Sequence, residues 1–454
     1  MPRDPLVDVA VDRDTGRRTL VAKRRFEAGE TLATDSPLIV WAQNEAGLLK
    51  SFQASDKQET ILSLYSPALD RQDEKIDERR KKAASLARTK AFSSLDKDTI
   101  LKVLLIGDAF AHQFKKQSAL YETASAMRHD CAPNCRFRSQ PDGSIEVTSI
   151  RHIPAGETLS FSYIGVPWVL CTSERRKLLR ESFEFFCVCR RCQAPDVLRS
   201  APCPGCGNFC SLEEPIAPPQ GPSSIFWHCP VCAKPFDATL HEEQLNLDFK
   251  TLAEKVQKAS SQIRDAYSRG KAPPQKVWEV FKDCEDFNWR SAKELGRGNV
   301  IVYRATELVV NTARDFSVAK DSFTAQNIQT DGDSAEDLRR RWVEATIRRV
   351  AQQECAAAGC SKGGECFATE SEHPAVYEAA ETVCGCAPVL ETQLSSLERE
   401  AFFDLCAKYR PMIRLMYDAS DEEKARVELL ESLLNAAPVE EEGAEEGVEE
   451  EKGA

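Results

Sequence analysis

Cysteine is the residue type with the clearest chemical pattern in this chain of 454 residues, which contains 18 of them. Cys187, Cys189 and Cys192 form a C-x-C-x-x-C run directly after the aromatic segment 183–186. Three thiolates on one tight loop supply three corners of a tetrahedral zinc site, so the fourth ligand has to come from elsewhere in the fold. The alternative reading is three incidental thiols, although closely spaced cysteines in a chain without a secretory signal usually bind metal.

Two C-P-x-C turns form a second cysteine pattern, at Cys203-Pro204-Gly205-Cys206 and Cys229-Pro230-Val231-Cys232. Main-chain N–H groups in such turns can point at the sulfurs and stabilise thiolates, and Gly207 allows the left-handed backbone that closes the first turn. Four protein ligands leave no open coordination position, so the pattern predicts a structural zinc site rather than a catalytic one. Cys210 and His228 are spare ligands that could substitute.

The remaining cysteines carry less information. Cys284 and Cys406 lie at helical spacing among apolar residues, which indicates buried core positions. An irregular group either holds another zinc ion or consists of free thiols, and its members are Cys355, Cys360, Cys366, Cys384 and Cys386, with His373 between them. We therefore expect two zinc ions per chain, with a third as the open alternative.

Composition divides the chain into the segments that must position these groups. Two stretches read as short strands and turns, a Pro/Gly/Cys-rich stretch has no helical period, and two others read as helical. The pattern predicts an α+β protein ending in a disordered acidic tail. In order, the segments are 6–41 (strands), 46–126 (helix-like), 127–192 (strands), 200–240 (cysteine-rich), about 242–434 (helices, with breaks near 271–274 and 329–333) and 436–454 (tail).

Charge and hydropathy exclude several functional classes. The net charge is −12, of which eight Glu and one Lys in 436–454 contribute −7, so the body is only mildly acidic and gives no argument for nucleic-acid binding. The basic run 79–82 is more typical of a solvated helix face than of a phosphate-binding patch. No run of about 18 apolar residues predicts a membrane span, and the N-terminus has no apolar signal region, so we expect the nucleus or the cytoplasm.

Four segments, taken in order, resemble the signatures of the SET-domain protein-lysine methyltransferases. Arg128–Asn134 is similar to the first signature, N-H-S-C-x-P-N, and Gly156–Tyr163 is similar to the second, G-E-E-(L/I)-x-(F/I)-x-Y. The C-x-C-x-x-C run matches the post-SET motif, and the residues from Gly16 to Thr31 resemble the N-terminal strand and turn more weakly. The SET-and-MYND class is most similar, but its MYND finger is absent because residues 1–130 contain no cysteine.

The resemblance implies a fold and an organisation. It implies a β-rich SET domain over 6–192, with a helical insertion at about 46–126 and a post-SET zinc loop at 187–192. A zinc-knuckle segment over 200–240 and an α-helical domain over 242–434 would follow. Cys131, in the first signature, would complete the zinc site with Cys187, Cys189 and Cys192.

The resemblance also implies an activity, S-adenosylmethionine-dependent N-methylation of lysine in a histone or another protein. Tyr163 would be the catalytic hydroxyl, whereas a tyrosine met without the signature is more often a core ring with a hydrated hydroxyl. The residues implied at the methyl donor are Gly16, Arg17, Arg128, His129, Asn134, Tyr163 and Phe185.

Three positions depart from the family pattern. Arg128 replaces the Asn that contacts the donor, Arg18 stands where a second Gly is expected, and Asp130 replaces Ser. Arginine is large and always charged, so Arg128 would either pair with the donor's carboxylate or fill its pocket. The alternative function is therefore a catalytically inactive SET scaffold that mediates protein interactions.

Overall fold

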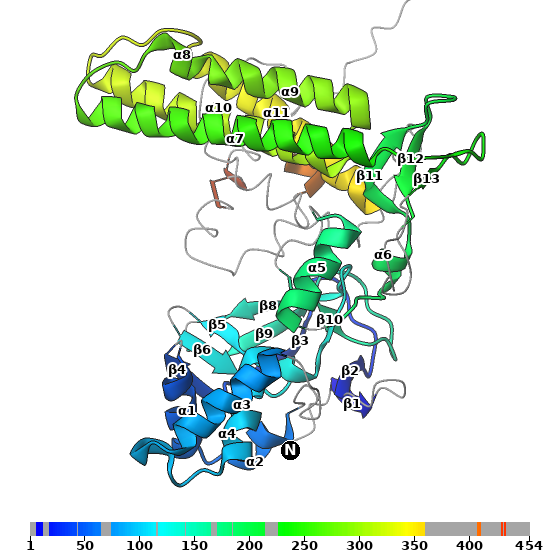
Figure 1. Cartoon of the computed structure of the whole chain (residues 1–454), viewed down its shortest axis with the longest axis vertical. Helices are drawn as coiled ribbons and strands as arrows, with labels where there is room; N and C mark the ends of the chain where they lie inside the picture. Colours follow the sequence, from blue (N-terminus) through cyan, green and yellow to red (C-terminus); the bar gives the residue numbers. More distant parts are fainter. Residues whose placement is uncertain are drawn as a thin grey trace, which may run out of the picture.

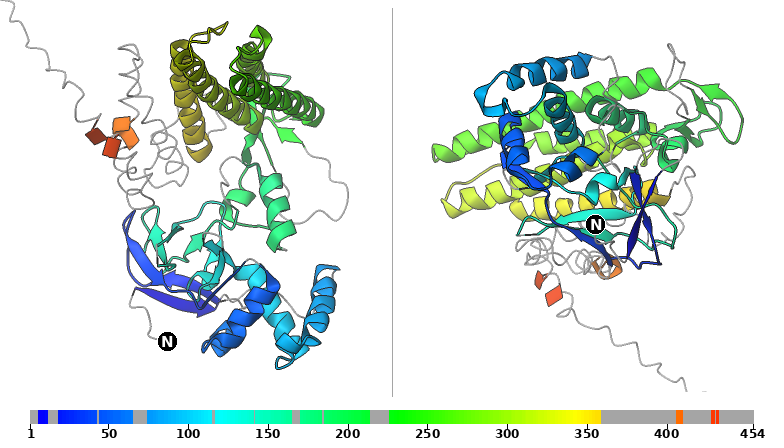
Figure 2. Two further views of the ribbon diagram at one scale, coloured as in Figure 1. Left: turned by 90° about the vertical axis from the view of Figure 1, so that its left-hand side faces the viewer. Right: turned by 90° about the horizontal axis from the view of Figure 1, so that it is seen from below.

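The computed structural model describes residues 6–11, 18–42, 44–64, 74–114, 117–140, 142–164, 170–183, 185–213, 226–358, 406–409, 428–429 and 431–432. Strands and short helices form one lobe, and a bundle of long helices forms a second lobe above it (Figure 1). Helix α5, Thr172–Phe183, lies between the two lobes, and the view turned by 90° shows the same separation (Figure 2).

The strand lobe consists of small sheets rather than one large sheet. Two of them have three strands each, with orders β3-β9-β8 and β4-β6-β5, and β1 pairs with β2. A two-residue parallel pair, β7 with β10, joins the two signature segments by placing Ser160 opposite Arg128. The strands are β1 Val7–Val11, β2 Arg18–Ala22, β3 Thr31–Asp35, β4 Ile39–Ala42, β5 His112–Phe114, β6 Gln117–Leu120, β7 Arg128–His129, β8 Cys135–Ser139, β9 Ile145–Ser149 and β10 Ser160–Phe161.

Two turns with the same sequence hold the core of this lobe together. The pentapeptide A-G-E-T-L occurs at 28–32 and again at 155–159. Phe26 and Ile153, two residues before each copy, exchange both main-chain hydrogen bonds at 2.9 and 3.0 Å, and both are fully buried. The glycines of the two turns have φ of 83° and 85°, a left-handed conformation that a side chain would strain.

The ion pairs of the two turns repeat as well. Arg24 pairs with Glu30, and Arg151 pairs with Glu157, in each case six residues apart. The N–H of Ala22 donates to the carbonyl of Glu157, so the second turn also binds the end of β2. The two copies therefore form an approximately two-fold arrangement that fixes the second signature against the N-terminal strands.

The insertion is helical only as far as Phe110. Asn44 and Asp96 cap two of its helices through hydrogen bonds from main-chain N–H groups, as short polar residues commonly do. Beyond Phe110 the expectation of helix up to residue 126 is wrong, because β5 and β6 form a hairpin that pairs with β4. The helices are α1 Glu45–Ala54, α2 Gln58–Ser63, α3 Glu74–Ala87 and α4 Lys97–Phe110.

The basic run of α3 is engaged in ion pairs. Arg79 donates two hydrogen bonds of 2.8 Å to Asp108 and also pairs with Glu45. Lys82 pairs with the same Glu45. These contacts fit the interpretation of the run as a charged helix face.

The cysteine-rich segment forms an antiparallel four-stranded sheet in the order β11-β12-β13-β14. Trp227 is completely buried in it and stacks on Phe236, and its indole N–H donates to the carbonyl of Arg199. The elements are α6 Arg190–Gln193, β11 Asp196–Pro202, β12 Phe209–Leu212, β13 Trp227–His228 and β14 Pro235–Phe236.

Long helices form the second lobe, and the expected breaks near 271–274 and 329–333 are confirmed as connections between them. Cys284 and Cys406 are buried, as their spacing predicts. No helix among the described residues has the length and apolarity needed to cross a lipid bilayer. The helices are α7 Thr239–Ser268, α8 Gln275–Trp278, α9 Val280–Leu295, α10 Val300–Ala325 and α11 Ala335–Ala358.

Some sequence-based predictions fall outside the described residues. These are the donor contacts of Gly16 and Arg17, the acidic tail, and most of the irregular cysteine group, namely Cys360, Cys366, His373, Cys384 and Cys386. Cys355 lies in α11.

Candidate functional site

Cys131 lies beside the C-x-C-x-x-C loop, although more than fifty residues separate them in the sequence. The Sγ atoms of Cys131, Cys187, Cys189 and Cys192 all lie within 4.8 Å of one another. Sγ of Cys131 is 3.9 Å from that of Cys187 and 3.6 Å from that of Cys192. Four sulfurs about 2.3 Å from one zinc ion would be separated by roughly 3.8 Å, so this group, the first cysteine cluster, fits zinc.

The second cysteine cluster joins the two C-P-x-C turns. Its Sγ atoms also lie within 4.8 Å of one another, with 3.4 Å between Cys203 and Cys232 and 3.4 Å between Cys206 and Cys229. Main-chain N–H groups reach the sulfurs, and the N–H of Cys232 is the largest cause of a lowered pKa, about 6, for Cys229. Cys210 is not among these four converging sulfurs, and its Sγ donates to the carbonyl of Asn208.

Two buried arginines on α5 support the first cysteine cluster. Arg175 is 1% exposed, and its guanidinium lies 3.5 Å from Sγ of Cys192. Arg176 donates to the carbonyl of Cys187 at 3.2 Å and to the carbonyl of Cys192 at 2.9 Å. The positive charge of Arg175 next to four thiolates offsets their mutual repulsion. The planar guanidinium of Arg176 holds both ends of the 187–192 loop.

Tyr163 lies where the two signature segments meet. Its hydroxyl donates to the main-chain carbonyl of Met127 at 2.7 Å, and its main-chain N–H donates to Nδ1 of His129 at 3.0 Å. Nε2 of His129 is 3.1 Å from Sγ of Cys131. His129 therefore connects the candidate catalytic residue to the first cysteine cluster.

Aromatic rings surround Tyr163. The ring of Phe185 lies 5.8 Å from that of His129 and 6.3 Å from that of Tyr163, measured between centroids. Phe161 and Phe183 contact Tyr163 at 4.8 and 5.1 Å. The structure thus brings together Tyr163, His129 and Phe185, three of the residues that the resemblance places at the methyl donor.

Asn134 is committed to holding two chain segments together. Its amide donates to the carboxylate of Glu157 at 2.8 Å and to the carbonyl of Thr158 at 2.9 Å, and its oxygen accepts from the N–H of Ser160 at 2.8 Å. The residue is 1% exposed. Because its polar atoms bind protein groups, its contact with a donor stays a prediction.

The three departures from the family pattern occupy different environments. Arg128 is exposed on β7, and Arg18 is half-buried at the start of β2. Asp130 accepts a hydrogen bond from the N–H of Ala132 at 2.7 Å, the kind of turn that the expected Ser also forms. Burial raises the pKa of Asp130 to about 7.

The family model described as SET domain matches residues 17–164, which include the insertion and both signature segments that follow it. The chain carries a SET domain. The first cysteine cluster then joins this SET domain to the C-x-C-x-x-C loop that follows it.

Curated relatives match a limited stretch. The chain is 36% identical over 77 residues to "Histone-lysine N-methyltransferase SMYD3" of Mus musculus, covering 17% of each chain. It is 36% identical over 91 residues to "Protein-lysine N-trimethyltransferase SMYD5" of Gallus gallus, covering 18% of this chain and 20% of the relative. It is 32% identical over 81 residues to "Histone-lysine N-methyltransferase set5" of Schizosaccharomyces pombe, covering 18% and 25%. The chain thus matches a quarter or less of the length of these relatives.

Sequence reasoning did not identify Arg175 and Arg176. A signal was present, because Thr172, Arg175, Arg176 and Leu179 recur at the spacing of one helix face and all are buried. Charged residues usually mark the solvated face of a helix, and this expectation hid them.

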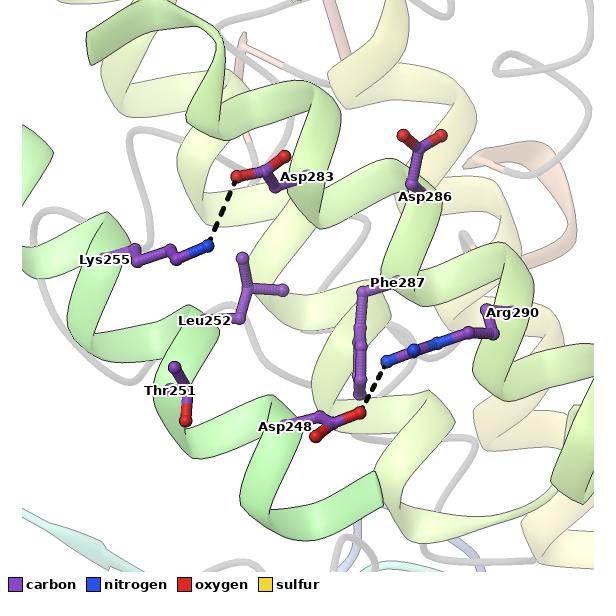
Figure 3. Close-up of a pocket in the computed structure, with 8 residues that line it drawn as sticks. All are labelled: Asp248, Thr251, Leu252, Lys255, Asp283, Asp286, Phe287 and Arg290. Atoms are coloured by element: carbon purple, nitrogen blue, oxygen red, sulfur yellow. Dashed lines mark hydrogen bonds and ion pairs between the residues drawn. The ribbon is translucent and has the colours of Figure 1, made fainter. Parts of the chain in front are cut away.

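A separate groove of about 390 Å³ runs between α7 and α9 (Figure 3). Two ion pairs cross it, Lys255 with Asp283 at 3.8 Å and Arg290 with Asp248 at 2.8 Å. These elements do not carry the residues around Tyr163, and the paired charges indicate a mixed surface of the helical lobe.

Proposed function

We propose that the chain is an S-adenosylmethionine-dependent protein-lysine N-methyltransferase. The observation that carries this proposal is the position of Tyr163, which lies at the crossing of the two SET signatures with its hydroxyl on a main-chain carbonyl and His129 beside it. The printed names of the relatives support the same reaction class, although they match a small part of each chain.

The residues around Tyr163 fit the chemistry of a sulfonium donor. The Met127 carbonyl and the Tyr163 hydroxyl lie 2.7 Å apart, so two oxygen atoms gather at one point of the site. Because the phenol O–H donates its hydrogen bond to the carbonyl, the lone pairs of the phenol oxygen stay available as acceptors. Preorganised oxygen dipoles of this kind stabilise a positive charge without reorganisation. When bound, S-adenosylmethionine supplies the methyl group.

The same residues orient and dehydrate the acceptor side. The rings of Phe161, Phe183 and Phe185, each partly buried, pack around Tyr163 and make its surroundings apolar. A lysine amine must lose its proton to act as a nucleophile, and a water-poor, apolar setting favours the neutral amine. We propose that Phe161 and Phe183 hold the aliphatic part of the lysine side chain, while Phe185 lies on the donor side.

We propose that zinc ions held by the two cysteine clusters are structural. Each cluster has four thiols and no open position. An ion in the first cluster would tie Cys131 to the 187–192 loop. An ion in the second would stabilise the β11–β14 sheet, where it has no direct contact with the Tyr163 region.

A catalytically inactive SET scaffold is the second candidate, and Arg128 favours it. This arginine occupies the signature position directly before His129, where an uncharged Asn is expected. A large cation at that point would obstruct the donor unless it pairs with the donor's carboxylate.

Isothermal titration of the zinc-loaded chain with S-adenosylmethionine tests the proposal. We expect binding in the micromolar range, followed by transfer of a radiolabelled methyl group to lysine in a protein array. Arg128→Asn is the matched variant: tighter binding by this variant would mean that Arg128 obstructs the pocket, and weaker binding would mean that it holds the donor. No binding by either form at millimolar donor would reject the enzyme and favour the scaffold.

A further inference from the structure

Helix α5 joins the helical lobe to the first cysteine cluster. Its N-terminal end lies against the helical lobe. Cys171, directly before the helix, packs in the core of that lobe, and Glu174 accepts hydrogen bonds of 2.7 and 2.8 Å from Arg304 of α10. The next residues, Arg175 and Arg176, point into the SET lobe. One rigid helix therefore spans the two bodies (Figure 1).

Arg176 makes a distinctive set of contacts within this helix. Nε donates to the carbonyl of Cys187 at 3.2 Å and Nη2 donates to the carbonyl of Cys192 at 2.9 Å, which are the first and last residues of the zinc-binding loop. Its guanidinium carbon also lies 4.2 Å above the ring of Phe186. Since a guanidinium is planar, these three contacts fix the direction in which the chain enters the loop.

That direction determines where Phe185 lies. Phe185 directly precedes Phe186, and its ring lies 5.8 Å from His129 and 6.3 Å from Tyr163. The cysteines hold the loop through its sulfurs, whereas Arg176 holds its main chain through the carbonyls of Cys187 and Cys192. The contact of Arg176 with the Phe186 ring extends this support to the residue next to Phe185, and Arg176 is only 5% exposed.

We propose that Arg176 is a positioning residue for methyl transfer, which holds Phe185 in place independently of the metal. This inference rests on the proposed function and deepens it, because it assigns control of donor binding to α5. Arg175 has a different role, since it contacts Sγ of Cys192 directly and therefore supports the ligand itself. Of the two adjacent arginines, Arg175 thus supports a metal ligand and Arg176 supports the main chain of the loop.

Arg176→Lys tests the proposal, because lysine keeps the charge and the stem but cannot contact both carbonyls and the ring together. Arg180→Ala is the control, since Arg180 is exposed on the same helix. We expect Arg176→Lys to keep its zinc content and its thermal midpoint within a few degrees, yet to bind donor about ten- to a hundredfold more weakly. Arg180→Ala should match the wild type in every measurement.

Amide hydrogen exchange of residues 185–192 provides a readout that does not depend on the donor. Faster exchange in Arg176→Lys, but not in Arg180→Ala, is expected. Unchanged exchange, or unchanged donor affinity in a variant whose exchange has increased, would overturn the inference. Loss of one zinc ion from Arg176→Lys would also overturn it, since the residue would then act through the metal. If the wild-type chain binds no donor, the proposed function fails, but the exchange comparison still decides whether Arg176 holds the loop. If Arg176→Lys does not fold, Phe186→Leu provides the same comparison.

Discussion

The main-chain N–H of Tyr163 donates to Nδ1 of His129, which requires this nitrogen to be unprotonated. The ring proton of neutral His129 is therefore on Nε2, where it points at Sγ of Cys131, 3.1 Å away. Burial lowers the pKa of His129 to about 4, so the neutral ring is the form present at pH 7. One imidazole thus fixes the candidate catalytic tyrosine relative to a cysteine of the first cluster.

Tyr163→Phe should lower methyl transfer by roughly ten- to a hundredfold, because it removes a preorganised oxygen from the site. The free energy of unfolding should fall by only about 1 kcal/mol, the usual worth of one hydrogen bond. Radiolabelled transfer and thermal unfolding measure the two effects. Tyr121→Phe is a matched control, since the Tyr121 hydroxyl donates to the carbonyl of Gly143 at the same distance, 2.7 Å, away from the signatures. Equal transfer by both variants would remove the hydroxyl from the mechanism.

Single ligand substitutions should separate the two cysteine clusters. Metal analysis of the intact chain is expected to give at least two zinc ions, and Cys131→Ser and Cys206→Ser should each lose one. Donor binding should be lost in Cys131→Ser and retained in Cys206→Ser, because only the first cluster lies beside Tyr163. A wild-type chain with fewer than two zinc ions, or equal effects of the two variants on donor binding, would contradict this assignment.

Acid should destabilise the SET lobe through His112. Burial lowers its pKa to about 4 from an ordinary 6.5, and its ring packs against Tyr121, Phe137 and Phe161. Between these pH values the unfolded chain binds a proton that the native chain does not, so stability is complete above pH 6.5 and falls as the pH drops towards 4. The loss is at most about 3 kcal/mol.

Urea unfolding of wild type and His112→Phe at pH 7.5 and 5.5 measures this effect. The variant should lose less stability on acidification, whereas any loss of zinc at low pH affects both chains equally. His241→Phe, at an exposed position, should behave as the wild type. Identical pH dependence of His112→Phe and wild type would show that another group titrates.

Asn134→Ala should cost about 2–4 kcal/mol of stability. The substitution leaves the N–H of Ser160 and the carbonyl of Thr158 without their partner in a buried crossing. Asn134→Asp should also destabilise, since it keeps the acceptor but places a second carboxylate beside Glu157. Chemical unfolding checks both. A mild effect of either variant would mean that the crossing is held by the strand pair alone.

The chemistry-bearing residues were accessible from the sequence because their spacing is local. The turns that carry Cys203 and Cys229 are visible as short motifs, and the family resemblance supplied Cys131, which spacing alone cannot connect to Cys187. The zinc itself stays a prediction, whereas the convergence of the sulfurs is a property of the structure.

Other features depend on long-range contacts that a linear pattern does not contain. The strands at 112–120 were missed because they are short and follow directly on the apolar helix α4, and their identity depends on pairing with Ile39–Ala42. Arg176 was missed because its partners are main-chain carbonyls, which have no signature in the sequence. The repeated A-G-E-T-L pentapeptide is visible in the sequence, but only the structure shows that Phe26 and Ile153, which precede its two copies, hydrogen-bond to each other.

The pairing of β4 with β6 has a consequence for the insertion. Ala42, where the chain leaves the SET lobe, lies opposite Gln117, close to where it returns. In topological terms α1–α4, followed by β5, form the connection between two adjacent antiparallel strands, and this strand pair holds the two ends of the connection together. We therefore expect α1–α4 to be exchangeable for a different small domain, or for a short turn, without moving Tyr163 or the cysteines that follow it.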